Sequence, residues 1–214
     1  GGEAAKPDRW ISTSAPAWLG DESERWGGNF AVKYWHPAWH DILYAGPRSF
    51  LARVQELGFD GVYLDRVDAY YEHIDEHPSA AEDMVTLVTR LADTAREARP
   101  GFLVVPQNGE ELLTRPAYVA AIDAIAKEDL FYGSPDEARP NSSAQIANSL
   151  GWLSHATTAG RRVLVVEYLD QPADVEAARA AIVERNYVPY FGPRGLDSLA
   201  PFVEARPGRR SDRR

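Results

Sequence analysis

Three short apolar runs of the sequence end in a carboxylate. Asp65 follows the run 62–64, Glu128 closes the segment that begins at 122, and Glu167 follows the run 163–166. In an α/β protein, such a run indicates a buried strand whose terminal side chain projects at the rim, where the connecting loops build sites. Two carboxylates placed in this way can cleave a glycosidic bond. One protonates the leaving oxygen, and the other attacks the anomeric carbon or activates a water.

We predict Asp65 and Glu128 as this pair, with Glu167 in reserve, because each of the two closes an apolar strand. The environment of the pair has to keep one carboxyl protonated and the other ionised. The sequence leaves open which carboxyl takes which role. An alternative role for Asp65 is to cap the helix that follows it, since Asp is a favoured N-cap residue.

Two histidine pairs raise the alternative of a zinc site. His73 and His77 fit a His-x-x-Glu-His pattern, but that pattern requires a helix, and Pro78 follows at once. His36 and His40 are also four residues apart, again with no obvious third ligand. Neither pair is favoured over the carboxylate pair.

A cluster of carboxylates is a second alternative, because oxygen ligands suit magnesium or calcium. Its members would be Asp65, Asp68, Glu128 and Asp129. We favour direct acid chemistry and predict neither a metal nor a cofactor. No Gly-x-Gly-x-x-Gly follows a strand and no Gly-x-Ser-x-Gly occurs, so the sequence indicates neither a dinucleotide fold nor a serine nucleophile.

The composition describes one acidic domain. The length of 214 residues suits a single domain, which we expect over 1–204, and the Arg-rich segment 205–214 is predicted to be a disordered tail. The net charge of −9 argues against nucleic acid as a partner and suits a cationic substrate. The chain has no cysteine, hence no disulfide, and no apolar run approaches the ~20 residues of a membrane span.

Strands and helices alternate along the chain. Strands are predicted over 30–35, 61–65, 102–105, 122–126, 163–166 and 187–191. Helices are predicted over 37–44, 47–57, 110–120 and 172–185, and Gly58 lies just beyond the end of the second. A further helix is predicted from a capping box at Ser79–Glu82 to Pro100. Another is predicted from a cap at 141–143 to residue 158. Residues 1–30 are predicted to be a loop. Its Trp10, Trp18 and Trp26 either stack on sugar or fix the loop to the domain.

The strands are continuous apolar runs, which is typical of a parallel sheet buried on both faces. A doubly wound sheet and a (β/α) barrel both fit this pattern. Polar residues follow several successive strands, which favours the barrel, because a doubly wound sheet concentrates its site at one switch point. The predicted strands fall short of the eight of a closed barrel, so we expect a barrel that lacks roughly its first one to three strands.

Several motifs, in order, resemble the strand-end motifs of glycoside hydrolase family 114, the endo-α-1,4-polygalactosaminidase-like barrels. They are Gly2–Ala4, Val32–Trp35, Gly58–Asp65, Pro106–Gly109, Lys127–Tyr132 and Val166–Tyr168. The resemblance implies a (β/α)8 barrel, a secreted or cell-surface location, and endo-type hydrolysis of α-1,4-linked galactosamine in a cationic polysaccharide.

The resemblance also maps the catalytic acids onto Asp65 and Glu128. It implies sugar contacts from Glu3, Tyr34, Trp35, Asp68, Gln107, Asn108, Tyr132, Glu167 and Tyr168. Carboxylates and aromatic faces of this kind would hold the ammonium of a deacetylated amino sugar. Two other functions stay open: a carbohydrate-binding barrel without turnover, and a metal-dependent hydrolase.

Overall fold

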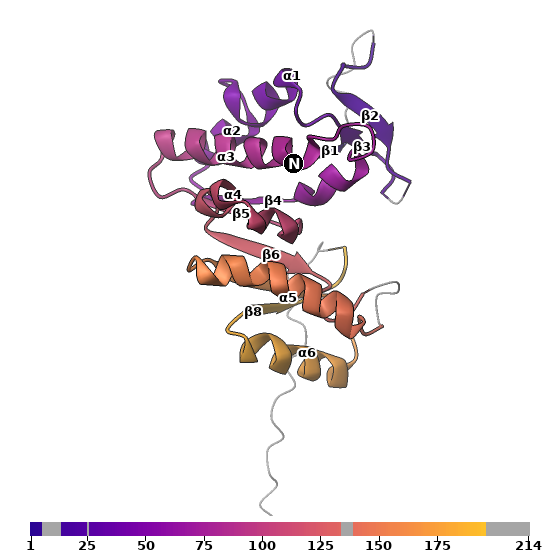
Figure 1. Ribbon diagram of the computed structural model, residues 1–214. Coiled ribbons are helices and arrows are strands. Elements are labelled where there is room, and N and C mark those ends of the chain that lie inside the picture. The colour runs from indigo at the N-terminus through magenta and orange to yellow at the C-terminus, as the bar shows by residue number, and fades with distance from the viewer. Residues whose placement is uncertain (6–13, 25, 134–138, 196–214) are drawn as a thin grey trace, which may run out of the picture.

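The computed structural model describes residues 1–5, 14–24, 26–133 and 139–195, and Trp10 and the predicted tail 205–214 lie outside them (Figure 1). The strands are β1 Glu3–Ala5, β2 Leu19–Glu22, β3 Asn29–Val32, β4 Gly61–Leu64, β5 Leu103–Pro106, β6 Ala124–Glu128, β7 Arg162–Glu167 and β8 Val188–Phe191. The α-helices are α1 Pro37–His40, α2 Phe50–Glu56, α3 Ala80–Ala98, α4 Pro116–Ala121, α5 Ser143–Thr158 and α6 Pro172–Glu184. Shorter turns are the π-helix η2 Asp41–Ala45 and the 3₁₀-helices η3 Val67–Glu72 and η4 Glu110–Thr114.

Strands β4 to β8 are parallel and follow one another in chain order. β4 pairs with β5, and β7 lies between β6 and β8. A parallel bridge between Gln107 and Ala126 joins β5 to β6. A doubly wound sheet reverses its strand order, whereas this order matches one arc of a (β/α) barrel. The sheets formed by the described residues do not close into a ring.

The N-terminal region departs from the prediction of a loop followed by a parallel strand. β1, β3 and β2 form a separate antiparallel sheet, in which Glu3 pairs with Ala31 and Leu19 with Val32. Gly28, at a φ of +83°, lies in the turn between β2 and β3. These strands have three or four residues each, too few to show a period of two in the sequence.

Helix ends agree with the sequence where a capping residue is decisive. Gly58 has a φ of +84° and directly follows the C-cap of α2, as a C′ glycine does. Ser142 and Gln145 form a reciprocal capping box at the start of α5. These contacts are local, so the sequence alone identifies them.

Two helix predictions were wrong in detail. Ser79 does not cap the backbone of α3, because its hydroxyl donates to the Asp83 carboxylate at 2.9 Å instead. The predicted helix 110–120 is split into η4 and α4 at Arg115, whose φ of −101° and ψ of 113° are extended. The residue before a proline is disfavoured in the helical region, and Pro116 therefore starts a new helix.

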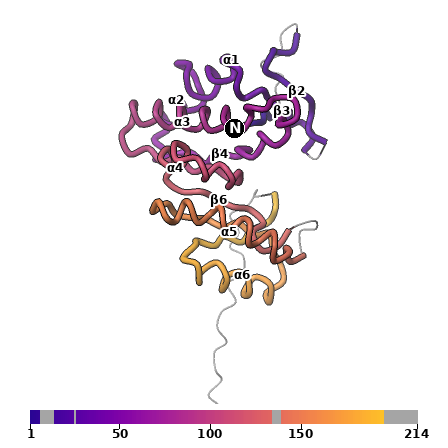
Figure 2. Tube along the Cα trace, in the orientation of Figure 1, coloured from indigo at the N-terminus to yellow at the C-terminus, as the bar shows by residue number. Residues whose placement is uncertain are grey.

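The parallel strands bring their carboxyl ends to one edge, which is where the site is built. Figures 1 and 2 show α3, α4, α5 and α6 following one another along the molecule in the same order as the strands. Buried apolar side chains of α3, such as Met84, Leu87 and Leu91, join a core with the strand residues Val104 and Ile125. Within the described part of the chain, no helix is both long enough and apolar enough to cross a bilayer.

Candidate active site

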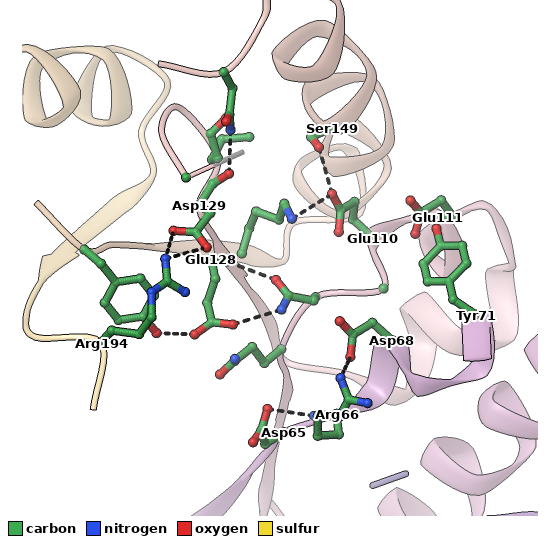
Figure 3. Close-up of a pocket in the computed structure, with 18 of the residues that line it drawn as sticks. Asp65, Arg66, Asp68, Tyr71, Glu110, Glu111, Glu128, Asp129, Ser149 and Arg194 are labelled. Atoms are coloured by element: carbon green, nitrogen blue, oxygen red, sulfur yellow. Dashed lines mark hydrogen bonds and ion pairs between the residues drawn. The ribbon is translucent and has the colours of Figure 1, made fainter. Parts of the chain in front are cut away.

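A cleft of about 890 Å³ opens at the carboxyl ends of the parallel strands (Figure 3). Seven of the predicted site residues line it: Glu3, Asp65, Asp68, Gln107, Asn108, Glu128 and Tyr168. The two carboxylates of the predicted pair therefore face one cavity, although Asp65 follows β4 and Glu128 ends β6. That shared cavity is the first condition for a pair that acts on one substrate.

Three strand ends at this cleft share an unusual backbone turn. Arg66, Asn108 and Asp129 have positive φ angles of 58°, 58° and 53°. Each follows a side chain that lines the cleft: Asp65, Gln107 or Glu128. Left-handed conformations cost energy in residues other than glycine and cluster at functional sites. The repeated turn therefore marks this rim as the part of the fold where backbone strain is concentrated.

At the end of β4, the Asp65 carboxylate accepts the Arg66 backbone N–H at 2.7 Å. The Arg66 guanidinium forms ion pairs with Glu3 at 3.1 Å, with Asp68 at 3.8 Å and with Glu72. Burial raises the pKa of Asp68, the Arg66 charge lowers it, and the Asp65 charge raises it again. The end of β4 is therefore a group of carboxylates around one cation.

At the end of β6, Glu128 is held by its neighbours on both sides. The Asn108 side-chain amide donates to Glu128 Oε2 at 3.0 Å, and Asn108 Oδ1 accepts the Glu128 backbone N–H at 3.0 Å. The Tyr168 hydroxyl donates to Glu128 Oε1. Residues that follow β5 and β7 thus fix the carboxylate between them, with both of its oxygens engaged.

Tyr63 of β4 is close enough to both carboxylates for their charges to affect its hydroxyl. Its ring is half exposed and lines the cleft. Burial raises the pKa of the Tyr63 hydroxyl, and the charges of Glu128 and then Asp65 raise it further. The charges of both acids therefore reach this one side chain of the cleft.

Two charge pairs complete the cleft. Glu110, only 4% exposed, accepts the Ser149 hydroxyl at 2.8 Å and lies 3.3 Å from Lys127 Nζ. Arg194 Nη2 lies 3.0 Å from Asp129 Oδ1, and its guanidinium lies 4.2 Å from the centre of the Tyr168 ring. Figure 3 shows Glu110 and Ser149 on one side of Glu128, and Arg194 on the other.

The reserve acid, Glu167, lies beneath the site and does not line the cleft. Its side chain is fully buried and accepts the Phe131 backbone N–H at 2.8 Å, in the segment after β6. Burial raises the pKa of the Glu167 carboxyl to about 7, with a smaller contribution from the Asp129 charge and opposition from the backbone hydrogen bonds. Glu167 is still within β7 and paired with Phe191, which explains why it faces inward.

Three aromatic residues that the sequence placed near the sugar also lie outside the lining of the cleft. Tyr34 is completely buried, and its hydroxyl donates to the Ala80 carbonyl at 2.7 Å. Trp35 stacks on His77 with ring centroids 4.0 Å apart. The Tyr132 hydroxyl is directed to Asp174 of α6, at 3.4 Å. Tyr34 and Tyr132 thus contact helix residues and Trp35 contacts the His77 ring, and none of the three lines the cleft.

The histidine pairs have other partners. His77 Nε2 lies 2.6 Å from Asp83 Oδ2, while His73 packs edge-on against Trp35. His40 Nε2 contacts the Tyr34 carbonyl at 2.8 Å, and the His36 ring caps α1. Among the described residues, no group of three or more His, Asp or Glu side chains has the arrangement of a metal site.

The profile of glycoside-hydrolase family GH114 matches residues 2–206, which is nearly the whole chain. The chain belongs to glycoside-hydrolase family GH114. This result confirms the family that the strand-end motifs indicated. Motif residues at the ends of β4, β5 and β6 in this GH114 chain line the cleft, among them Asp65, Asn108 and Glu128.

Uncharacterized proteins of three organisms are related to this GH114 chain. The identity is 40% over 185 residues with a protein of Deinococcus radiodurans, 34% over 168 with one of Thermotoga maritima, and 32% over 208 with protein MJ1477 of Methanocaldococcus jannaschii. These matches cover 86%, 76% and 90% of this chain, and 58%, 50% and 58% of the relatives. The chain thus spans about half the length of the curated relatives that it matches.

Among solved structures, the chain is similar to the glycoside hydrolase domain of PelA from Pseudomonas aeruginosa. The TM-score is 0.68 at 20% identity, over 92% of this chain and 77% of the other. A variant of the same domain gives a TM-score of 0.66. At this level of identity, the likeness supports the fold of the GH114 chain and leaves its substrate open.

Several cleft residues of the GH114 chain were not predicted as site residues. Arg194 follows the last strand, Tyr71 lies in η3, and Ser149 and Trp152 lie on α5. For Arg194 a signal existed, since it comes three residues after β8 and so, like the acids of other strands, lies near a strand end. The α5 residues gave no such signal, because polar residues on a helix usually indicate a solvated face.

Proposed function

We propose that this chain is a glycoside hydrolase whose reaction is carried out by Asp65 and Glu128. The observation that carries the proposal is the opening of both side chains into one cleft at the carboxyl ends of β4 and β6. Family membership supports the reaction class. One carboxyl protonates the leaving oxygen, and the other stabilises or attacks the anomeric centre, directly or through a water.

The surroundings of the two acids give each a defined orientation. Asn108 and Tyr168 hold both oxygens of Glu128, so its carboxylate is fixed before substrate arrives. Asp65 is oriented by a single backbone N–H and is more open to solvent. Positioning of this kind supports catalysis, because small displacements of reacting groups are costly.

The charge of the cleft favours a cationic polysaccharide. Seven carboxylates and three cations line it, and Arg66, Lys127 and Arg194 are each paired with a carboxylate. A surplus of negative charge in a cleft attracts ammonium groups. Together with the resemblance of the strand-end motifs, which is the source of the sugar, the linkage and the location, this charge leads us to propose α-1,4-linked galactosamine as the substrate, cut internally, by a protein that acts outside the cell. The arc of parallel strands supports a (β/α)8 barrel in the whole protein.

Two conservative variants test the catalytic pair. Asp65→Asn and Glu128→Gln should each lower the release of reducing ends from polygalactosamine by a factor on the order of 10³. Asp60→Asn is the matched control, because Asp60 precedes the same strand β4 at its opposite end and is 85% exposed. The control should keep the wild-type rate, and thermal melts should show that all three variants are folded.

Wild-type rates in both variants would refute the catalytic assignment. Binding of the polymer with no new reducing ends from the wild-type chain would favour a carbohydrate-binding barrel instead. Equal cleavage of the deacetylated and the fully acetylated polymer would remove the charge argument, because only the deacetylated polymer carries ammonium groups.

A further inference from the structure

The residues that line the cleft on the two sides of Glu128 differ in chemistry, and Figure 3 shows Arg194 on one side and Tyr71 with Glu111 on the other. At one end, the Arg194 guanidinium lies 4.2 Å from the Tyr168 ring centre and pairs with Asp129 at 3.0 Å. The face of this ring is already covered by a cation. A protonated amino sugar placed there would meet the Arg194 charge and would find no open aromatic face.

The opposite end offers an open ring beside a carboxylate. Tyr71 of η3 is 51% exposed and packs on Tyr70, with ring centroids 4.3 Å apart. The Tyr70 hydroxyl donates to Glu111 Oε2 at 3.0 Å, and Figure 3 shows Glu111 beside Tyr71. Tyr70 thus supports the ring from one side and also orients the carboxylate. Aromatic faces and carboxylates are the groups that bind ammonium ions and the apolar faces of ligands.

Helix α5 forms the facing wall with one stripe of side chains. Gln145, Asn148, Ser149 and Trp152 all line the cleft, and their spacing of three, one and three residues places them on one helical face. Asn148 supplies an amide and Trp152 a partly buried indole. Polar groups beside an aromatic ring are what a sugar-binding wall requires.

A buried charge pair fixes this wall to the floor of the cleft. The Ser149 hydroxyl donates to Glu110, which is 4% exposed and lies 3.3 Å from Lys127 Nζ. Lys127 directly precedes Glu128 in β6. The position of α5 is thereby coupled to the strand that carries the proposed catalytic acid.

We propose that this end of the cleft, formed by Tyr71, Glu111 and the α5 stripe, is a subsite for a hexosamine unit distant from the bond that is cut. The inference rests on the proposed function and extends it. In the subsite, Glu111 binds the ammonium group, Tyr71 or Trp152 stacks on the sugar ring, and the α5 amide binds its hydroxyls. The subsite selects long, deacetylated chains over short or acetylated ones.

Oligomer binding tests the subsite in the Asp65→Asn chain, which retains the cleft. A trimer and an octamer of α-1,4-linked galactosamine are titrated, and the octamer should bind more tightly. Tyr71→Ala and Trp152→Ala should each weaken octamer binding by about ten-fold and leave trimer binding unchanged. Tyr190→Ala is the matched control, because Tyr190 of β8 is 44% exposed and does not line the cleft.

Glu111→Gln tests the charge of the subsite alone, because glutamine keeps the size of the side chain and removes its negative charge. This variant should bind the deacetylated octamer more weakly than the parent does, and should bind the acetylated octamer as the parent does. Thermal melts identify any variant that fails to fold, and the remaining two variants then decide. If all three folded variants bind the octamer like the parent, the subsite is refuted.

The failure of the subsite and the failure of the proposed function give different results. If the parent binds neither oligomer, the hexosamine ligand is wrong and the subsite falls with it. If the wild-type chain binds the octamer in a Tyr71-dependent manner but releases no reducing ends, the subsite stands and the hydrolase activity is refuted.

Discussion

The ends of β4 and β6 have the same backbone turn but hold their acids in different ways. After Asp65 comes the left-handed Arg66, and after Glu128 comes the left-handed Asp129. Asp65 accepts its hydrogen bond from the backbone of the very next residue. Glu128 is held by the side chain of Asn108 on one side and of Tyr168 on the other. One acid is thus positioned locally and the other by tertiary contacts.

The two turn residues also carry opposite charges. At β4, the turn residue Arg66 is a cation among the carboxylates Glu3, Asp68 and Glu72. At β6, the turn residue Asp129 is a carboxylate bound to the cation Arg194. Each end therefore compensates its buried charge separately. A substitution around Glu128 should disturb one acid while leaving the other in place, which makes the difference testable.

Among substitutions of the residues that hold Glu128, the largest effect is expected for Asn108→Asp. The new carboxylate can still accept the Glu128 backbone N–H and tolerates the left-handed backbone. It replaces the amide donor with an oxygen facing Glu128 Oε2, where the donor stood at 3.0 Å. Two carboxylates at that distance repel each other and share a proton. Loss of orientation should lower kcat about 100-fold near pH 7, with partial recovery at acidic pH.

A second left-handed asparagine supplies the control for this variant. Asn186 has a φ of 58°, follows α6 and does not line the cleft. Asn186→Asp should keep wild-type activity at all pH values. A kcat for Asn108→Asp within a few-fold of wild type would mean that the Asn108 amide does not position Glu128, and Tyr168 would be left as the tertiary contact that distinguishes Glu128 from Asp65.

The sequence predicts those features of the site and fold that depend on residues close together along the chain. Asp65 follows a four-residue apolar strand, and Gly58 ends the helix before it, so a reader of the sequence can place both. The same holds for the Ser142 cap of α5. Each depends on residues within a few positions along the chain, whose preferences are known.

The orientation of the predicted aromatic residues could not be read in this way. β3 ends at Val32, and the Tyr34 N–H then bonds back to the Val32 carbonyl at 2.9 Å, so the alternation of a strand stops before Tyr34. Its ring turns into the core. For Glu167 the strand ends later than predicted. β7 runs one residue beyond the apolar run 163–166, so Glu167 is still part of the strand and its carboxyl stays buried. Both outcomes depend on where pairing stops, which tertiary structure decides.

A smaller effect is expected for Tyr168→Phe. This variant removes the hydroxyl that donates to Glu128 Oε1 and keeps the ring beneath Arg194. Since Asn108 still holds the other oxygen, kcat should fall only about ten-fold, the value of one hydrogen bond to a charged group. Tyr132→Phe is the control, because its hydroxyl contacts Asp174 outside the cleft. Equal rates for the two variants would show that the Tyr168 hydroxyl does not position Glu128.

The smallest expected effect concerns stability at the end of β7, where the acid is buried. The folded pKa of Glu167 is about 7, against 4.5 for a free carboxyl. Between these pH values the folded chain keeps a proton that the unfolded chain has lost. This carboxyl therefore makes the wild-type protein less stable as pH rises through that window, by at most about 3 kcal/mol.

Glu167→Gln cannot ionise, yet its amide oxygen can still accept the Phe131 N–H. The fall in Tm between pH 5 and pH 8 should therefore be smaller in Glu167→Gln than in wild type, by a few degrees. Glu184→Gln, at a side chain that is 79% exposed, should follow the wild-type curve. Parallel curves for wild type and Glu167→Gln would mean that the buried carboxyl titrates like an exposed one. In that case, β7 would not differ from β4 and β6 in the way that its strand-end acid is held.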